Sequence, residues 1–372
     1  MSAFGTKNDT RNTDGARMKK LAFVAIILLV TAVVGALYFY QSIDQYGIEN
    51  KYNVQDGAIL TIQLKAGDSG TSVLNKLEAK GVFRNPLFAK LWLKLHPQYS
   101  VVKKGYYEFT TGASIESIFN AISKGTVKQF SIALIEGLTL SQWLELLANN
   151  GAINYDIDDT NALYEQIIGV HYNNNNSPES FVTSFCHNQY NSLEGCLLAN
   201  TYFFDYKTNA SYIIKRAYEN MQLVINEEWQ ERYIDTIYDS PYEMLIMASI
   251  IEKETAVESE RGLISGVFDN RLKRNMRLQT DPTVIYGVGP SFDGNLTRKH
   301  LRQKTPYNTY VIKGLPITPI AMAGPASIKA AAKPDITEAI YFVAKGDGTH
   351  QFSENLAEHN AAVRQYQLNK GK

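Results

Sequence analysis

Two glutamates, Glu252 and Glu254, end a segment that is otherwise mainly apolar, and a carboxyl group in such surroundings can act as an acid. Burial disfavours the charged form, so the pKa rises and the group can hold a proton near neutral pH. Leu245, Ala248 and Glu252 recur at helical spacing, which predicts Glu252 on the core-facing stripe of a helix. Glu254 lies about 200° further round and is expected on a solvated face.

Spacing alone also allows a structural interpretation of Glu252. It could be a helix-end glutamate that pairs with Lys253 or with Arg271, and the spacing by itself favours this simpler role. Periodicity therefore identifies a candidate acid without establishing an enzyme.

A helical hairpin must position this carboxyl group. Ser240, Pro241 and Glu243 suit the cap and the first turn of the first helix. A second helix follows over 263–272, and the stretch 278–282 is typical of an extended polar segment. Asp281 is expected to cap a short third helix, so that the polar side chains of this segment face the open end of the hairpin.

The sequence lacks the spacing patterns of a metal site or of a serine nucleophile. Its six histidines form no HExxH motif or pair at ligand spacing, and CxxC and GxSxG motifs are absent. We therefore expect no metal and no cofactor. Cys186 and Cys196 are compatible with one short-loop disulfide in an exported protein, and equally with two separate buried thiols.

Length and charge suit a foldable chain of about two domains. The 372 residues are 45% hydrophobic and carry 37 basic and 37 acidic side chains. This balance, without basic clusters interleaved with aromatic residues, argues against nucleic acid as a partner.

The N-terminal region predicts a membrane anchor. Residues 21–40 carry no charge and, as a helix, would cover a hydrocarbon core of about 30 Å. The polar tail of residues 1–20 is basic, which favours a cytoplasmic N-terminus and places the body outside the cytoplasm. A cleaved signal peptide is the alternative, but the apolar run is long and no small-residue cleavage site follows it.

A small module is expected between the anchor and the hairpin. Residues 41–57 are polar and predict a stalk, and residues 58–135 show strand, helix, helix and strand patterns in that order. This β-α-α-β order looks like a LysM-type module, a fold that binds N-acetylated glycans. A spacer without glycan binding is equally compatible with the pattern.

Three blocks carry a resemblance to a known family. They are ASIIEKET at 248–255, RLQTDPTVIYG at 277–287 and TPYNTYVIKGLPITPI at 305–320, and their order and spacing resemble the endolytic murein transglycosylase family, also called YceG-like. The resemblance implies that Glu252, the first glutamate of EKET, is the catalytic acid and base. It also implies a LysM-like module and a catalytic domain over 136–372.

The activity implied by the resemblance is lytic cleavage of peptidoglycan glycan strands between N-acetylmuramic acid and N-acetylglucosamine, leaving 1,6-anhydro ends and setting chain length. Gln279, Thr280, Asp281 and Asn308 are the candidates for holding the sugar, although each could be an ordinary loop residue. Implied partners are nascent glycan strands and cell-wall synthases, at the cell inner membrane with a periplasmic catalytic part.

The predicted fold class is α+β, with a single transmembrane helix, a LysM-like β-α-α-β module and a mixed α+β catalytic domain whose helical hairpin carries the catalytic glutamate. Two alternatives remain. A membrane-anchored glycan-binding scaffold for the synthases would need no catalysis. An older assignment of the family to aminodeoxychorismate lyase would need a cytosolic enzyme that binds pyridoxal phosphate, and the apolar span argues against it.

Overall fold

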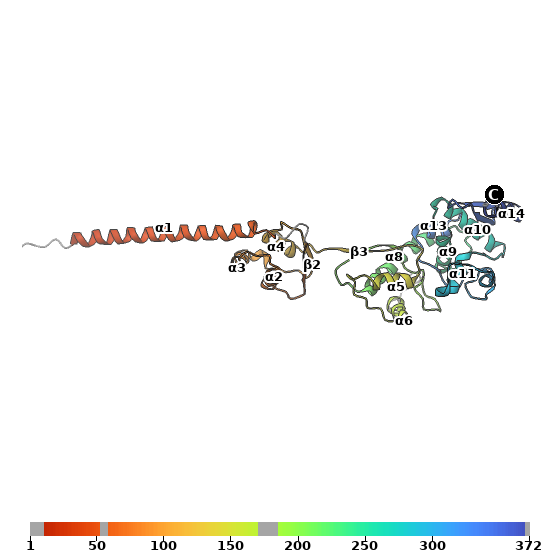
Figure 1. The fold of residues 1–372 in the computed structure, drawn as a ribbon, viewed down its shortest axis with the longest axis horizontal. Helices are drawn as coiled ribbons and strands as arrows, with labels where there is room; N and C mark the ends of the chain where they lie inside the picture. Colours follow the sequence, from red (N-terminus) through yellow and green to blue (C-terminus); the bar gives the residue numbers. More distant parts are fainter. Residues whose placement is uncertain (1–10, 53–58, 170–184, 369–372) are drawn as a thin grey trace, which may run out of the picture. The chain divides into compact units, whose positions relative to one another are not determined.

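The computed structural model describes residues 11–52, 59–169 and 185–368, and they form two compact units, 1–129 and 130–372 (Figure 1). The first ten residues of the expected tail, and 53–57 of the expected stalk, lie outside the described residues. Along the sequence, the boundary between the two units falls after residue 129, a few residues before the expected boundary at 135. The reason is that the strand beginning at Phe130 pairs within the second unit.

The first unit contains one long helix and a small α+β module. Its elements are α1 (Arg11–Glu49), β1 (Leu60–Leu64), α2 (Gly70–Glu78), α3 (Pro86–Leu95), η1 (Pro97–Tyr99), β2 (Gly105–Phe109) and α4 (Ile115–Lys124). The two strands pair antiparallel, with Leu60 opposite Phe109 and Leu64 opposite Gly105. The β-α-α-β order that the sequence predicts is therefore present, and α4 ends at Gly125, whose φ of 77° favours glycine.

Helix α1 is longer than the predicted span at both ends. Residues 17–40 are exposed, and the helix is long and apolar enough to cross a membrane. The rest of α1 corrects the expected stalk: Ile43 is buried, and the hydroxyl of Tyr46 exchanges hydrogen bonds with the backbone of Asn85. Residues 41–49 thus belong to the module, because Ile43 and Tyr46 lie one turn apart and face α3.

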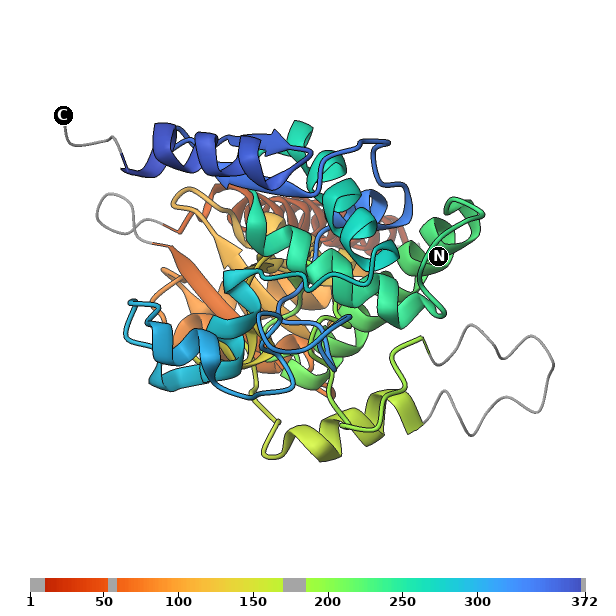
Figure 2. The same cartoon turned by 90° about the vertical axis from the view of Figure 1, so that its right-hand side faces the viewer.

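The second unit is predominantly helical and contains two small antiparallel sheets of two strands each among the described residues. Its elements are β3 (Phe130–Leu134), α5 (Leu140–Ala148), α6 (Thr160–Tyr164), η2 (Glu165–Gly169), β4 (Asn200–Phe204), α8 (Ala210–Glu231), α9 (Pro241–Glu254), η4 (Glu258–Glu260), α10 (Arg261–Lys273), α11 (Asp281–Val288), η5 (Gly289–Ser291), α12 (Arg298–Arg302), α13 (Pro325–Ala332), β5 (Tyr341–Ala344), β6 (His350–Ser353), α14 (Leu356–Val363) and η6 (Arg364–Leu368). Strand β3 pairs with β4 and β5 with β6, both antiparallel. Helix α14 packs on the β5–β6 hairpin (Figure 2). The mixed α+β class is confirmed.

Helix α9 is the central element of this unit. Helices α8, α10, α11 and α13 contact it, and every residue from Met244 to Ile251 is buried. It begins as the sequence predicts, with the Ser240 side chain accepting from the backbone N–H of Glu243 and with Pro241 in the first turn. Because α9 is buried all round, it has no single apolar stripe, so periodicity cannot tell which of its terminal side chains faces solvent.

Candidate active site

The carboxylate of Glu252 ties α9 to its neighbours. One oxygen accepts hydrogen bonds from the backbone N–H of Gly324, at 3.0 Å, and from the hydroxyl of Ser327, at 2.7 Å. The other lies 3.8 Å from a guanidinium nitrogen of Arg261, and the side chain is 7% exposed. Glu252 therefore has its hydrogen-bonding capacity occupied by the first turns of α10 and α13, and it does not line the cavity described below.

Neither of the partners expected for Glu252 contacts it. Lys253 donates to the carbonyl of Gly137 at 3.0 Å, and Arg271 binds backbone carbonyls elsewhere. The ion pair runs to Arg261 instead, because the turn after α9 brings the start of α10 beside Glu252.

Glu254, the last residue of α9, occupies a different environment. Its carboxylate accepts a hydrogen bond from the Thr280 hydroxyl and lies within a cavity rather than on a solvated face, so the expectation for this side chain is wrong. Burial raises the pKa of Glu254, and the negative charge of Asp281 raises it further. The Thr280 hydrogen bond and the charges of His350 and Arg271 act in the opposite direction. Burial is the largest of these effects, so Glu254 fits a general acid.

The cavity beside Glu254 has a volume of about 580 Å³. It is lined by Glu254, Arg271, Leu278, Gln279, Thr280, Asp281, Tyr310, Tyr341, Phe342, Val343, Ala344, His350, Leu356, His359, Asn360, Val363 and Gln367. All of them come from the second unit, in particular from the ends of α9 and α10, the segment before α11, the β5–β6 hairpin and α14. Three of the four predicted sugar-holding residues are therefore brought together with Glu254.

The segment 278–281 is held in place by Thr309. The backbone N–H of Gln279 donates to the Thr309 carbonyl at 3.2 Å, and that of Thr280 donates to the Thr309 hydroxyl at 3.1 Å. Gln279 has a φ of 50°, a left-handed conformation that is uncommon for a residue with a side chain. These contacts direct the Thr280 hydroxyl to Glu254, and the hydroxyl of Tyr310 donates to Asp281 at 2.7 Å.

Asn308 does not line the cavity with the other candidates. It is 1% exposed, and its amide nitrogen donates to the carbonyls of His300, at 3.1 Å, and Gln303, at 2.7 Å. Its amide oxygen accepts from the backbone N–H of Tyr310 at 3.0 Å. The side chain of Asn308 is thus used to shape the loop before Tyr310, which itself lines the cavity.

Sequence reasoning missed the cavity positions of Glu254 and Arg271. The one available signal was the second glutamate of EKET. For Arg271, His350 and Tyr310 the sequence offers no signal of mutual proximity, because they come from three separate segments.

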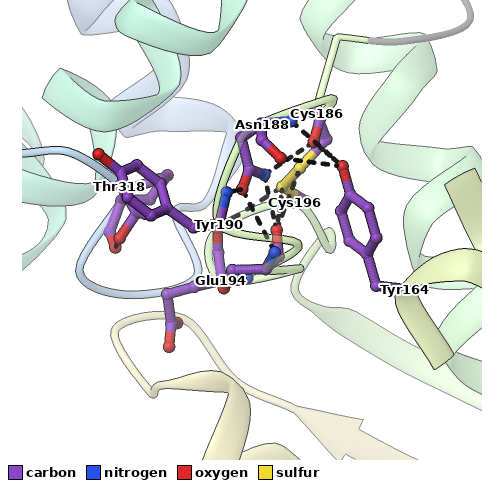
Figure 3. Close-up of a disulfide and its surroundings, with 9 residues drawn as sticks. Tyr164, Cys186, Asn188, Tyr190, Glu194, Cys196 and Thr318 are labelled. Atoms are coloured by element: carbon purple, nitrogen blue, oxygen red, sulfur yellow. Dashed lines mark hydrogen bonds between the residues drawn. A yellow bond between two sulfur atoms is a disulfide. The ribbon is translucent and has the colours of Figure 1, made fainter. Parts of the chain in front are cut away.

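Within the described ranges no group of three histidine, cysteine, aspartate or glutamate side chains is arranged to hold a metal ion. The structure joins Cys186 and Cys196, whose Cα atoms are 6.0 Å apart, in a disulfide (Figure 3). Neither cysteine lines the cavity. The amide of Asn188 donates to the carbonyls of Cys186 and Ser192, both at 2.9 Å, and so closes the loop around the two sulfur atoms.

Glu194 is a second carboxyl group with a raised pKa, buried in the core away from the cavity. It accepts from the backbone N–H of Leu140, at 3.0 Å, and from the hydroxyl of Tyr286, at 3.2 Å. Burial raises its pKa to about 7, although these hydrogen bonds partly oppose the effect. Since it lies outside the cavity, we assign it to the core rather than to the chemistry.

The second unit is a mixed α+β domain with a cavity around one half-buried carboxyl group of raised pKa. The chain belongs to the YceG-like family, whose model matches residues 62–365. An endolytic murein transglycosylase of Bacillus subtilis strain 168 is 31% identical over 310 residues, covering 82% of this chain and 84% of that protein.

More distant relatives and a solved structure agree with this assignment. The endolytic murein transglycosylase of Streptococcus pneumoniae strain D39 is 24% identical over 371 residues, covering 93% of this chain and 65% of the relative, so this chain matches about two thirds of the pneumococcal protein. A crystal structure of a YceG-like protein from Listeria monocytogenes matches with a TM-score of 0.54 and 29% identity, covering 82% of this chain and 98% of that one.

Proposed function

We propose that this chain is an endolytic peptidoglycan lytic transglycosylase, and that Glu254 is its general acid and base. The observation that carries the proposal is the position of Glu254, a half-buried carboxyl group with a raised pKa in a cavity of about 580 Å³. The names of the relatives supply the substrate, murein, and the type of reaction.

The reaction needs only one group that donates and then accepts a proton. Protonated Glu254 donates to the glycosidic oxygen between N-acetylmuramic acid and N-acetylglucosamine as the bond from C1 to that oxygen breaks. The resulting carboxylate then takes the proton of the muramyl C6 hydroxyl, whose oxygen bonds to C1 and closes a 1,6-anhydro ring. No water is consumed, in contrast to glycosidases that use two carboxyl groups. Acid/base catalysis of this kind contributes on the order of 10²–10⁴-fold.

Glu252, the acid that the sequence pattern predicts, is the rival assignment. Its carboxylate already accepts from Gly324 and Ser327 and faces Arg261, so its oxygens are occupied within the fold and are not available to a sugar. These contacts support a structural role for Glu252 in holding α9 against α13.

We assign the sugar contacts to Gln279, Thr280 and Asp281, the predicted binding residues that line the cavity with Glu254. Gln279 and Asp281 are exposed, so an amide and a carboxylate are available to sugar hydroxyl and N-acetyl groups. Asn308 is left out of the sugar contacts, because the carbonyls of His300 and Gln303 occupy its amide.

Helix α1 anchors the protein in the cell inner membrane, with the catalytic unit on the periplasmic side. Its exposed apolar face supports the anchor, and the basic residues Arg17, Lys19 and Lys20 before the apolar run support a cytoplasmic N-terminus. A reporter fused after Lys372 tests the orientation, since activity of a reporter that works only in the cytoplasm would contradict it.

The β-α-α-β module is proposed to be LysM-like and to bind glycan beside the membrane, where cell-wall synthases release new strands. Its strand pairing and element order support the comparison, whereas its role and the synthase contact rest on the family resemblance. In the scaffold alternative, both Glu254→Gln and Glu252→Gln would leave the cellular function intact.

Mass spectrometry of digested glycan tests the reaction type. The full chain in detergent is incubated with purified glycan strands, and the new chain ends are identified. The proposal expects internal cleavage with anhydro-muramyl ends. Reducing muramic acid ends would mean that water is the nucleophile, and the absence of new ends would favour the scaffold.

A further inference from the structure

Arg271 is a buried cation without a carboxylate partner. Its residue surface is 7% exposed, yet among the described residues no carboxylate oxygen lies within the 4.0 Å ion-pair distance of its guanidinium. Burial lowers the pKa of Arg271, which expresses the cost of holding a charge away from water. Buried charges in proteins are normally paired, because an unpaired one is strongly destabilising. The ring of Tyr341, whose centroid lies 5.2 Å from the guanidinium carbon, and the charge of Glu254 compensate Arg271 in part. Since neither forms an ion pair at contact distance, the arginine points to an anion that arrives with a ligand.

The contacts of Arg271 fix the guanidinium while leaving one end of it free. Its Nε donates to the carbonyl of Ile340 and its Nη1 to the carbonyl of Leu278, both at 2.6 Å. Nη2 has no hydrogen-bond partner in the described part of the chain. It is accessible to solvent, so it is not a buried polar atom left without a partner. Arg271 lines the cavity, so this nitrogen has access to a bound molecule.

His350, on the strand β6, supplies a second donor or acceptor to the same cavity. The buried carboxylate of Glu260 accepts from the backbone N–H of His350, at 2.9 Å, and contacts its Nδ1 at 2.8 Å. This pair places a proton on Nδ1 and holds the ring in one orientation, so Nε2 donates to an anion in the form of the ring in which it also carries a proton. Nε2 has no hydrogen-bond partner in the described residues. Like Nη2 of Arg271, it is accessible to solvent.

We propose that Arg271 and His350 form an anion subsite that binds a carboxylate of the substrate beside Glu254. The inference deepens the proposed function, on which it rests, by specifying the muramyl sugar, since its lactyl arm is the acidic part of the glycan. The carboxylate is either the free lactyl carboxylate of a peptide-free strand or a carboxylate of the peptide attached to that arm. Guanidinium binding to a carboxylate is charge-assisted and directional, so the subsite would set which sugar faces Glu254.

The subsite also acts on the acid. The charges of Arg271 and His350 lower the pKa of Glu254 in the empty cavity. A carboxylate bound between them offsets those charges, so substrate binding favours the protonated acid that the first step requires.

Equilibrium binding tests the subsite separately from catalysis. The full chain in detergent carries Glu254→Gln in every sample, so that the ligand stays intact. The ligands are muramyl tetrasaccharides in three forms: the free lactyl acid, its neutral methyl ester and the peptide-bearing form. We expect the methyl ester to bind more weakly than at least one of the two acidic forms by about tenfold or more, the worth of a charge-assisted hydrogen bond.

Variants then locate the contact. Arg271→Gln should remove the preference for the acidic form over the methyl ester, and His350→Gln should reduce this preference in part. Arg274→Gln is the matched control, because this arginine is exposed, pairs with Glu338 at 3.6 Å and lies outside the cavity. A folding defect would weaken the binding of all ligands equally and would leave the ratio of their affinities unchanged, so this ratio separates a lost contact from a folding defect. Should Arg271→Gln not fold, the His350→Gln ratio decides.

The outcomes are distinct. A preference for the free lactyl acid that Arg271→Gln abolishes identifies the lactyl carboxylate, and a preference for the peptide-bearing form that it abolishes identifies a peptide carboxylate. Equal binding of all three forms, or a preference that both variants retain, overturns the subsite. Cleavage of the ligands by the Glu254→Gln protein would instead contradict the acid assignment, while the affinity ratios would still test the subsite.

Discussion

The carboxylates of Glu252 and Glu254, two residues apart on α9, contact opposite partners: Glu252 accepts from Gly324 and Ser327 of the α13 end, and Glu254 accepts from Thr280 in the cavity. Two steps along a helix turn the side chain by about 200°, so neighbouring glutamates can serve separate purposes. One holds the core together and the other faces the space where a substrate can lie.

Thr280→Val should change the pH dependence of cleavage. The hydroxyl of Thr280 donates to the carboxylate and thereby lowers the pKa of Glu254. Valine keeps the shape but removes this donor, so the pKa of Glu254 rises and the acid keeps its proton to higher pH. We expect the alkaline limb of the kcat/KM profile to move to higher pH. An unchanged limb would show that Glu254 is not the group that titrates.

The local features of this fold are readable from the sequence, because they depend on neighbours in the chain. The Ser240 cap forms as expected, and so does the β-α-α-β order of the first unit. An element's start depends on a few adjacent side chains, which is why these predictions succeed.

The direction of Glu254 depends on contacts distant in sequence. The stripe argument assumed that α9 has one buried and one solvated face, but four helices surround it. Thr280 and Thr309 meet at its end only in the folded chain, and so do Arg271 and His350. Asn308 likewise gave no sign that the carbonyls of His300 and Gln303 would occupy its amide.

Asn308→Ala should destabilise the protein without weakening substrate binding. The substitution leaves two carbonyls and one backbone N–H without their buried partner, at a cost on the order of 2–4 kcal/mol. Chemical denaturation measures the loss, and KM for glycan should be unchanged once the protein is folded. A raised KM at full stability would return Asn308 to the sugar-binding set.

Glu194→Gln should alter the pH dependence of stability. The folded pKa of about 7 lies above the ordinary value of 4.5, so the folded state binds the extra proton more tightly than the unfolded chain does. This contribution is complete below about pH 4.5 and is lost as pH rises through 7, by up to about 3 kcal/mol. Relative to the variant, the wild type should therefore lose stability between pH 5 and 8. If the unfolding free energies of the wild type and of Glu194→Gln changed in parallel with pH across that range, Glu194 would not be a buried carboxyl group that holds its proton.

The Cys186–Cys196 bond should protect both thiols and stabilise the fold. It closes a loop with a sequence separation of 10, for which chain entropy predicts a contribution of about 3 kcal/mol. The unreduced protein, once denatured, should take up no thiol label, and the paired substitution of both cysteines by alanine should lower the free energy of unfolding. Labelling of both positions in the unreduced, denatured protein would rule the bond out.

Cleavage by Glu254→Gln and Glu252→Gln, measured on the same glycan preparation, tests the central assignment most directly. The amide of Glu254→Gln keeps the shape and can accept from Thr280 but cannot transfer a proton, so anhydro-muramyl ends should form at least about 100-fold more slowly at an unchanged Tm. Glu252→Gln should lower Tm, because its ion pair with Arg261 is lost, and should retain most of the cleavage by the folded fraction. Near wild-type cleavage by Glu254→Gln, together with loss of cleavage in a stable Glu252→Gln protein, would contradict this assignment and restore Glu252 as the acid.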